Sequence, residues 1–282
     1  MTNGMRKFRR AAKLFFCCLP IFLAACGSPP PRQPVAVEQA QQVEHAAHRA
    51  MRDGDLALAR ELFTQSMWLQ QSMDNLSGAA MAAINVATVS HRLGDGEAAL
   101  GQLEHILADS APAYPPELRA AAAFRKAVIL ADAGNTAAAE SALQLADTGC
   151  FKPCAYTPGI SNLRARLALQ QGDHAVALKL AKATLDTSGA EKEELANARR
   201  ISAAAEAAQG RHEAALAHYM AALGLDKEQG LSARIAVDLN GIAKALEQLG
   251  RKPEADAYAR RAAAVMEATR FLPNGAMKKP VP

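Results

Sequence analysis

Six short segments of this sequence repeat one pattern that is built around glycine. The spacings between these glycines are 40, 40, 38, 38 and 40 residues. The glycines are Gly54, Gly94, Gly134, Gly172, Gly210 and Gly250. Alanine stands five residues after and seven residues before each of them, and chance would fill only about three of these twelve positions with alanine. A pattern of this regularity indicates a repeat protein.

Each repeated glycine is typical of a turn between two helices, because glycine adopts the left-handed conformation that ends a helix at little cost. Asp or Asn follows the glycine in four repeats and can cap the next helix. These candidate caps are Asp55, Asp95, Asn135 and Asp173. Alanine on both helices allows them to approach closely. We therefore expect helical hairpins that stack, so that neighbouring hairpins bury each other's apolar faces.

The repeat pattern resembles the tetratricopeptide repeat (TPR) family over residues 37–270, most clearly over 239–262. Phe63 and Tyr219 match the family's aromatic position on the second helix, whereas Leu103 and Leu143 replace it elsewhere. The period of 38–40 exceeds the family's usual length of about 34, which predicts longer helices or loops. The resemblance implies an all-α, TPR-like α-solenoid of about six helical hairpins that forms a right-handed superhelix. Aromatic residues make up only 5% of the chain, which also argues against a β-sandwich.

The first 25 residues are typical of a secretory signal peptide. Five basic residues and no acidic residue precede an apolar run, Leu14 to Ala25, that is too short to span a bilayer. Leu23-Ala24-Ala25-Cys26 resembles the lipobox of bacterial lipoproteins, which implies cleavage before Cys26 and acylation of that cysteine, hence a palmitate-type membrane anchor. An ordinary cleaved signal peptide is the alternative.

Residues 26–36 are rich in proline and predict an extended tether between the anchor and the repeats. Gly27, rather than Asp, follows Cys26, which by the family's sorting rule favours the outer membrane, facing the periplasm. The tail, residues 271–282, has no helical periodicity and is expected to be mobile.

The charge of the chain argues against a nucleic-acid partner. The formal charge is +4, but the predicted signal peptide carries five positive charges and no negative one, which leaves 4 − 5 = −1 for the mature protein.

Cys150 and Cys154 are the two cysteines that remain as thiols after processing and acylation. An even pair in an oxidising compartment predicts a disulfide.

None of the candidate enzyme motifs in the sequence has the residue spacing that its chemistry requires. His212-Glu213 opens like a zinc-protease motif, but the next histidine, His218, lies six rather than four residues on. His45 and His48 could share a metal, although a solvated helix face is the simpler interpretation. Cys150 and Cys154 are not spaced as in the redox C-x-x-C motif. We expect no metal, no cofactor and no catalysis.

The resemblance places a ligand groove on the first helix of each hairpin, about 13, 10, 6 and 3 residues before each turn glycine. The predicted peptide-binding residues are Ile84, Asn85, Phe124, Val128, Asn162, Arg166, Asn197, Arg200, Asn240 and Lys244. In the family, groove asparagines hold a ligand's main chain and basic residues bind its carboxylates. The asparagines could instead bond neighbouring helices. Under the binding hypothesis, Arg200→Glu weakens binding and leaves the fold intact.

These features favour a non-enzymatic, lipid-anchored periplasmic scaffold that binds a protein or peptide. The resemblance suggests pilus, secretin or outer-membrane assembly as contexts. Two alternatives remain open at this point: an adaptor or regulator of peptidoglycan enzymes, and a cell-wall glycan-binding protein.

Overall fold

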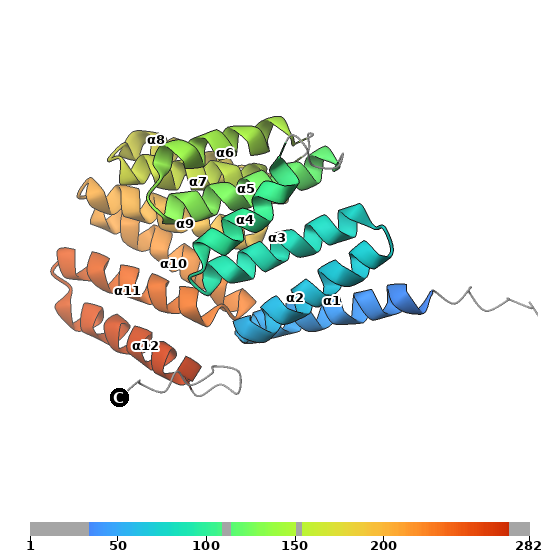
Figure 1. The fold of residues 1–282 in the computed structure, drawn as a ribbon. Helices are drawn as coiled ribbons and strands as arrows, with labels where there is room; N and C mark the ends of the chain where they lie inside the picture. The colour runs from blue at the N-terminus through green and yellow to red at the C-terminus, as the bar shows by residue number, and fades with distance from the viewer. Residues whose placement is uncertain (1–33, 109–113, 151–153, 271–282) are drawn as a thin grey trace, which may run out of the picture. The chain divides into compact units, whose positions relative to one another are not determined.

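The computed structural model describes residues 34–108, 114–150 and 154–270. In these ranges the chain forms twelve α-helices and no strand (Figure 1). The helices are α1 (Val35–Asp53), α2 (Leu56–Ser72), α3 (Leu76–Arg92), α4 (Gly96–Leu107), α5 (Pro116–Asp132), α6 (Thr136–Thr148), α7 (Thr157–Gln170), α8 (His174–Leu185), α9 (Lys192–Ala208), α10 (His212–Gln229), α11 (Ser232–Gln248) and α12 (Lys252–Arg270). None of them is long and apolar enough to cross a membrane.

Several predictions from the sequence fall outside the described residues. These are the signal peptide 1–25, the acylated Cys26, most of the tether and the tail 271–282. The predicted tether 26–36 overlaps the first helix, because α1 begins at Val35. Pro34 directly precedes that helix, at a point where the missing N–H of proline costs no helical hydrogen bond.

The predicted hairpin turns are confirmed. All six repeat glycines have positive φ, between 74° and 89°, in the region that favours glycine. The four predicted capping side chains each accept a hydrogen bond from the backbone N–H three residues on, as Asp55 does from Leu58 and Asn135 from Ala138. The twelve helices therefore form six hairpins, from α1–α2 to α11–α12.

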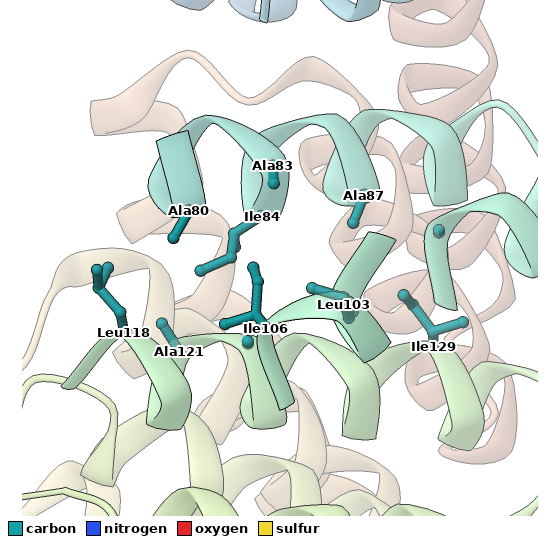
Figure 2. Close-up of a cluster of buried hydrophobic side chains, with 11 residues drawn as sticks. Ala80, Ala83, Ile84, Ala87, Leu103, Ile106, Leu118, Ala121 and Ile129 are labelled. Carbon is teal, nitrogen blue, oxygen red and sulfur yellow. The ribbon is translucent and has the colours of Figure 1, made fainter. Parts of the chain in front are cut away.

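The repeated alanines hold the helices together at close range. Ten of the twelve are fully buried, and Ala243 and Ala255 are 8% and 6% exposed. Successive hairpins close the core as expected, and one cluster joins α3, α4 and α5 (Figure 2). In it Ile84 from α3 packs with Ile106 from α4 and Leu118 from α5.

Enlarging a buried alanine should strain this contact. Ala127→Leu is expected to lower the free energy of unfolding by about 1–3 kcal/mol, because Ala127 is fully buried and overpacking has this typical cost. Ala137→Leu is the matched control, since Ala137 is exposed on α6. Urea denaturation of both variants measures the difference. Equal midpoints would show that Ala127 does not lie at a tight helix contact.

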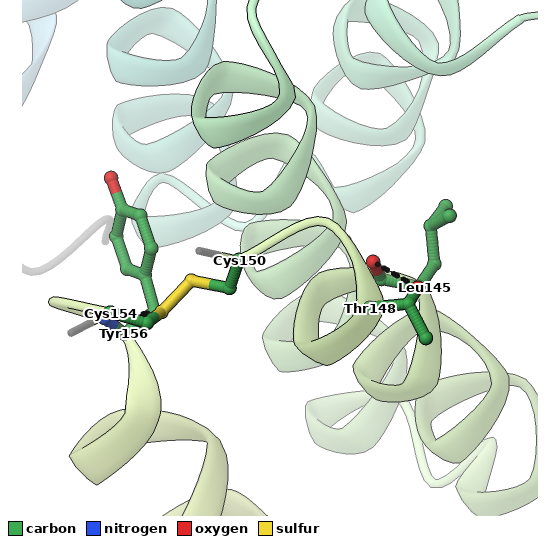
Figure 3. Close-up of a disulfide and its surroundings, with 5 residues drawn as sticks. All are labelled: Leu145, Thr148, Cys150, Cys154 and Tyr156. Carbon is green, nitrogen blue, oxygen red and sulfur yellow. Dashed lines mark hydrogen bonds between the residues drawn. A yellow bond between two sulfur atoms is a disulfide. The ribbon is translucent and has the colours of Figure 1, made fainter. Parts of the chain in front are cut away.

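A disulfide joins Cys150 and Cys154 in the connection between the third and fourth hairpins, with their Cα atoms 5.5 Å apart (Figure 3). The connection follows the end of α6, where the Thr148 hydroxyl donates to the Leu145 carbonyl. The backbone N–H of Tyr156 donates to Cys154 Sγ at 3.3 Å, directly before α7 begins. The disulfide therefore lies at the entrance to a helix that lines the cavity described next.

Candidate binding cavity

A cavity of about 550 Å³ opens on the first helices of the third to sixth hairpins. Its walls come from α5, α7, α9 and α11, with one residue, Tyr219, from α10. The apolar part of the lining includes Phe124, Val128, Leu163, Ile201, Tyr219 and Val237. The rest of the lining is mostly polar, with six charged side chains and two asparagines. The volume of the cavity is within the usual range of ligand sites.

The cavity lies on the face of these helices to which the repeat spacing assigns the groove. Six of the ten predicted groove residues line the cavity: Phe124, Val128, Asn162, Arg166, Asn197 and Arg200. Asn240 and Lys244 are exposed on α11, and Asn85 is half-buried on α3, all outside the cavity. Whether the six lining residues bind a ligand stays a prediction.

Ile84 is a correction to the predicted groove. It occupies the same position in its repeat as Phe124 does, but it is only 6% exposed. The side chains of α4 and α5 cover it, so that it belongs to the core shown in Figure 2. An apolar residue at a predicted groove position of the repeat can therefore be buried in the core.

Arg200 is held inside the protein by two buried carboxylates. Its Nη1 contacts Asp226 of α10, and it also lies 3.2 Å from Oδ1 of Asp238 on α11. Both aspartates are fully buried, whereas the Arg200 side chain is 15% exposed. Its Nη2 donates to Asn197 Oδ1 at 2.7 Å. Arg200 therefore joins three helices, and the expectation that it is free to bind a ligand carboxylate is not supported by this geometry.

The two aspartates give this cluster a pH dependence. Burial raises the pKa of Asp238 to about 7; Arg200 opposes the rise and nearby Asp226 adds to it. Burial also raises the pKa of Tyr219, which faces the same cluster. The folded protein thus keeps a proton on Asp238 at a pH where the unfolded chain has released it.

We expect the free energy of unfolding to fall by about 3 kcal/mol between pH 5 and pH 8 on account of Asp238, since each pKa unit corresponds to about 1.4 kcal/mol. The sign follows because the folded state binds the proton more tightly, so deprotonation favours unfolding. Asp238→Asn should flatten this slope, and Asp256→Asn, at an exposed position on α12, should leave it unchanged. Urea denaturation at four pH values measures the slopes. Equal slopes for wild type and Asp238→Asn would contradict the assignment.

Two of the predicted groove asparagines, Asn162 and Asn197, have partners within the protein. Asn162 is 4% exposed, and its Nδ2 donates to the Glu194 carbonyl at 2.9 Å and to Glu194 Oε2 at 2.7 Å. Asn197 Nδ2 lies 3.5 Å from the same oxygen. The structure therefore supports the alternative interpretation for Asn162, whose amide joins α7 to α9, whereas Asn197 bonds residues of its own helix. The carboxylate of Glu194, which both amides contact, lines the cavity.

Two further arginines of the cavity also face carboxylates. Nη2 of Arg166 lies 2.8 Å from Asp132 Oδ1, in an ion pair that is not aligned as a hydrogen bond. Arg234 of α11 contacts Glu193 of α9. The polar wall is thus a set of arginine–carboxylate pairs that connect successive hairpins.

Arg125 differs from the other arginines that line the cavity. No hydrogen bond or ion pair reaches its guanidinium from the described residues, and its Nε is buried without a partner. Burial lowers the pKa of Arg125, and the carboxylate of Glu193, which already contacts Arg234, opposes that shift. The cavity therefore contains one desolvated cation without a close counterion among these residues.

Close packing at Gly159 shapes the cavity floor. A Cβ atom at Gly159 would lie 2.7 Å from Phe124 Cζ and 3.3 Å from Glu194 Oε1. The ring of Phe124 and the carboxylate of Glu194 therefore both lie against this one position of α7. Tyr156 extends the aromatic surface, with its ring centroid 5.9 Å from that of Phe124.

Several residues of this site were not predicted from the sequence, among them Arg125, Gly159, Glu194, Asp226 and Asp238. Gly159 stands 13 residues before Gly172, so the groove spacing already pointed to it. Asp226 and Asp238 gave no signal, because isolated acidic residues on helices usually face solvent.

No protein-family model matches the sequence, and no curated protein matches it significantly. The fold is similar to the crystal structure of Rap protein complexed with competence and sporulation factor, with a TM-score of 0.59 and 16% identity over 83% of this chain and 67% of that chain. It is also similar to BtubC from P. vanneervenii, with a TM-score of 0.58 and 14% identity over 85% of this chain and 94% of that one. A tetratricopeptide repeat protein from Parabacteroides merdae ATCC 43184 aligns with a TM-score of 0.44 and 16% identity over 84% and 94% of the two chains. The helical hairpins with their turn glycines, together with the first two likenesses, show that the chain folds as a TPR-like α-solenoid.

Proposed function

We propose that this protein is a non-enzymatic scaffold that binds a protein or peptide segment in the cavity of α5, α7, α9 and α11. The observation that carries the proposal is the cavity itself, which lies on the first helices of consecutive hairpins and combines apolar walls with charged groups. An extended segment laid across these helices would contact several hairpins at once, which is how repeat folds build their binding surfaces.

The likeness to Rap protein supports a search for such a ligand. That protein was crystallised in a complex with competence and sporulation factor, and its fold resembles that of this chain over most of the described repeats. The likeness concerns the fold, and the residues that would bind here are those of this chain.

The polar groups of the cavity favour binding over catalysis. Arg200, Arg166 and Arg234 each face a carboxylate, so these groups hold one another in place. His218, which precedes the cavity residue Tyr219, is not among the residues that line the cavity. Its ring contacts Arg199, and burial lowers its pKa. Such an arrangement suits a rigid receptor surface.

Panning of a random dodecapeptide library against the full-length protein in detergent micelles tests the proposal. We expect enriched peptides that bind saturably, with dissociation constants in the micromolar range or below. An array of peptidoglycan fragments serves as the parallel probe. Saturable binding to the glycans without any saturable peptide would replace the scaffold with a cell-wall glycan-binding protein.

We further propose that acyl chains on Cys26 anchor the scaffold in the outer membrane, facing the periplasm, where it serves pilus, secretin or outer-membrane assembly. The support is the lipobox-like sequence Leu23-Ala24-Ala25-Cys26 behind a basic start. Several acyl chains hold a protein on a bilayer far more stably than one chain does.

Cys26→Ser should abolish acyl labelling and leave the protein either soluble or with its signal peptide uncleaved. Fractionation of cells grown with a labelled fatty acid measures both effects, and Cys17→Ser, inside the predicted signal peptide, is the matched control. Unchanged membrane retention of a Cys26→Ser protein that carries no label and has lost its signal peptide would contradict the lipoprotein assignment.

A further inference from the structure

Within the part of the chain that the structure describes, two charged groups of the cavity have no ion pair, and they have opposite signs. Arg125 on α5 has no ion pair within the described residues. Glu194 on α9 has none there either, because its contacts are with the neutral amides of Asn162 and Asn197. The remaining arginines of the cavity are neutralised by Asp132, by Glu193 and by the buried aspartate pair.

Glu194 lies where a cation would be favoured. Its Oε2 accepts from Asn162 at 2.7 Å, while its Oε1 points toward Gly159 and the ring of Phe124. A carboxylate beside an aromatic ring attracts an ammonium or guanidinium group, by charge and by the ring's negative face. The two asparagines fix the carboxylate in this position rather than contacting the ligand.

Arg125 provides the complementary subsite. It follows Phe124 directly in α5, so the two side chains leave the same helix turn in different directions and both reach the cavity. A guanidinium that is partly buried without a counterion is costly to the fold alone, and an incoming carboxylate would neutralise it with paired hydrogen bonds.

We propose that the cavity recognises a bipolar peptide segment, whose cationic group binds Glu194 beside Phe124 and whose carboxylate binds Arg125. This inference rests on the proposed peptide-binding function and specifies its ligand class. The cationic group is a lysine or arginine side chain or an amino terminus, and the carboxylate is an acidic side chain or a carboxy terminus. Apolar residues between them contact Val128 and Leu163.

Four matched hexapeptide mixtures test the charge requirement on the full-length protein in micelles. All four mixtures share a frame of Ala, Leu and Phe residues with capped termini. Each peptide also carries one pair of residues at randomised positions. The pair is Lys with Glu in the first mixture, Lys with Gln in the second, norleucine with Glu in the third and norleucine with Gln in the fourth. A fifth mixture of the doubly neutral frame with free termini distinguishes terminal charges from side-chain charges. The measured quantity is the concentration of each mixture at which the rise in the protein's thermal midpoint reaches half of its largest value.

We expect the Lys/Glu mixture to act at a concentration roughly tenfold or more below that of either singly charged mixture. In the Arg125→Met variant, mixtures with Glu should act at the same concentration as those with Gln, whereas mixtures with Lys should still act at a lower concentration than those with norleucine. Glu194→Gln should show the reverse. The controls are Arg164→Met and Glu228→Gln, which remove surface ion pairs outside the cavity and should behave as wild type.

Stability provides a readout that needs no ligand. Arg125→Met should leave the thermal midpoint of the unliganded protein unchanged or raise it, because a desolvated charge without a counterion is removed. A marked fall would identify Arg125 as a structural residue and overturn its assignment to a carboxylate.

The outcomes separate the two proposals. Equal action of all the mixtures would leave a peptide-binding cavity but overturn the bipolar ligand. Loss of the Lys preference in Arg125→Met, or of the Glu preference in Glu194→Gln, would overturn the assignment of the two subsites. If no mixture raises the midpoint and panning yields no peptide, the proposed function fails and the ligand class fails with it.

Discussion

Arg200→Met should lower the free energy of unfolding by about 3–5 kcal/mol, because it leaves Asp226 and Asp238 fully buried without their cation. The loss should be larger at pH 8 than at pH 5, since protonation of Asp238 relieves the repulsion between the two carboxyl groups. Arg200→Glu should be worse still, because it adds a third carboxylate. The expectation that this reversal spares the fold is therefore revised.

Urea denaturation of three proteins isolates this effect. Arg234→Met is the matched arginine control: its partner Glu193 is about half exposed, and such pairs contribute up to about 1 kcal/mol. Arg200→Met combined with Asp226→Asn and Asp238→Asn should recover much of the lost stability, because no buried charge remains. A loss below 1 kcal/mol for Arg200→Met alone would show that the cluster is more hydrated than its burial indicates.

Phe63→Ala should destabilise the first hairpins by about 3–5 kcal/mol, which is typical for deleting a buried aromatic side chain. Phe63 of α2 is fully buried against α1 and α3, where it packs with Ala47, Ala59 and Val89. The rings of His48 and Phe63 are nearly perpendicular, with their centroids 5.0 Å apart. Because each repeat couples mainly to its neighbours, the effect should remain local.

Hydrogen exchange measured by mass spectrometry gives the location of this effect. Protection should fall in α1–α3 and remain near wild type in α9–α12. Leu58→Ala, at a residue of the same helix that is 42% exposed, is the control and should change little. A uniform fall of protection along the chain would indicate a single cooperative unit instead of nearest-neighbour coupling.

The hairpin architecture could be predicted from sequence because its determinants are local. A glycine with positive φ, a capping Asp or Asn and two alanines act within about a dozen residues, and each leaves a visible pattern. The same spacing located six of the lining residues of the cavity, since the face of a helix follows from its period.

The pairing of charges inside the cavity could not be predicted in this way. The partners of Arg200 are 26 and 38 residues distant in sequence and lie on two other helices. Asn162 meets Glu194 across 32 residues. Such contacts depend on the rotation and offset between hairpins, which the repeat pattern does not specify, so residues of similar type in the groove could not be sorted into paired and unpaired ones.

The central claim is that the cavity of α5, α7, α9 and α11 is the binding site. The most direct test is to fill this cavity with a large side chain. Ala204 lines the cavity on α9, whereas Ala217 is exposed on α10 outside it. Calorimetric titration of the panned peptides should show at least tenfold weaker binding to Ala204→Trp and wild-type affinity for Ala217→Trp, with both variants melting as wild type does. Equal affinity of wild type and Ala204→Trp for those peptides would place the binding surface elsewhere on the repeats and contradict the account.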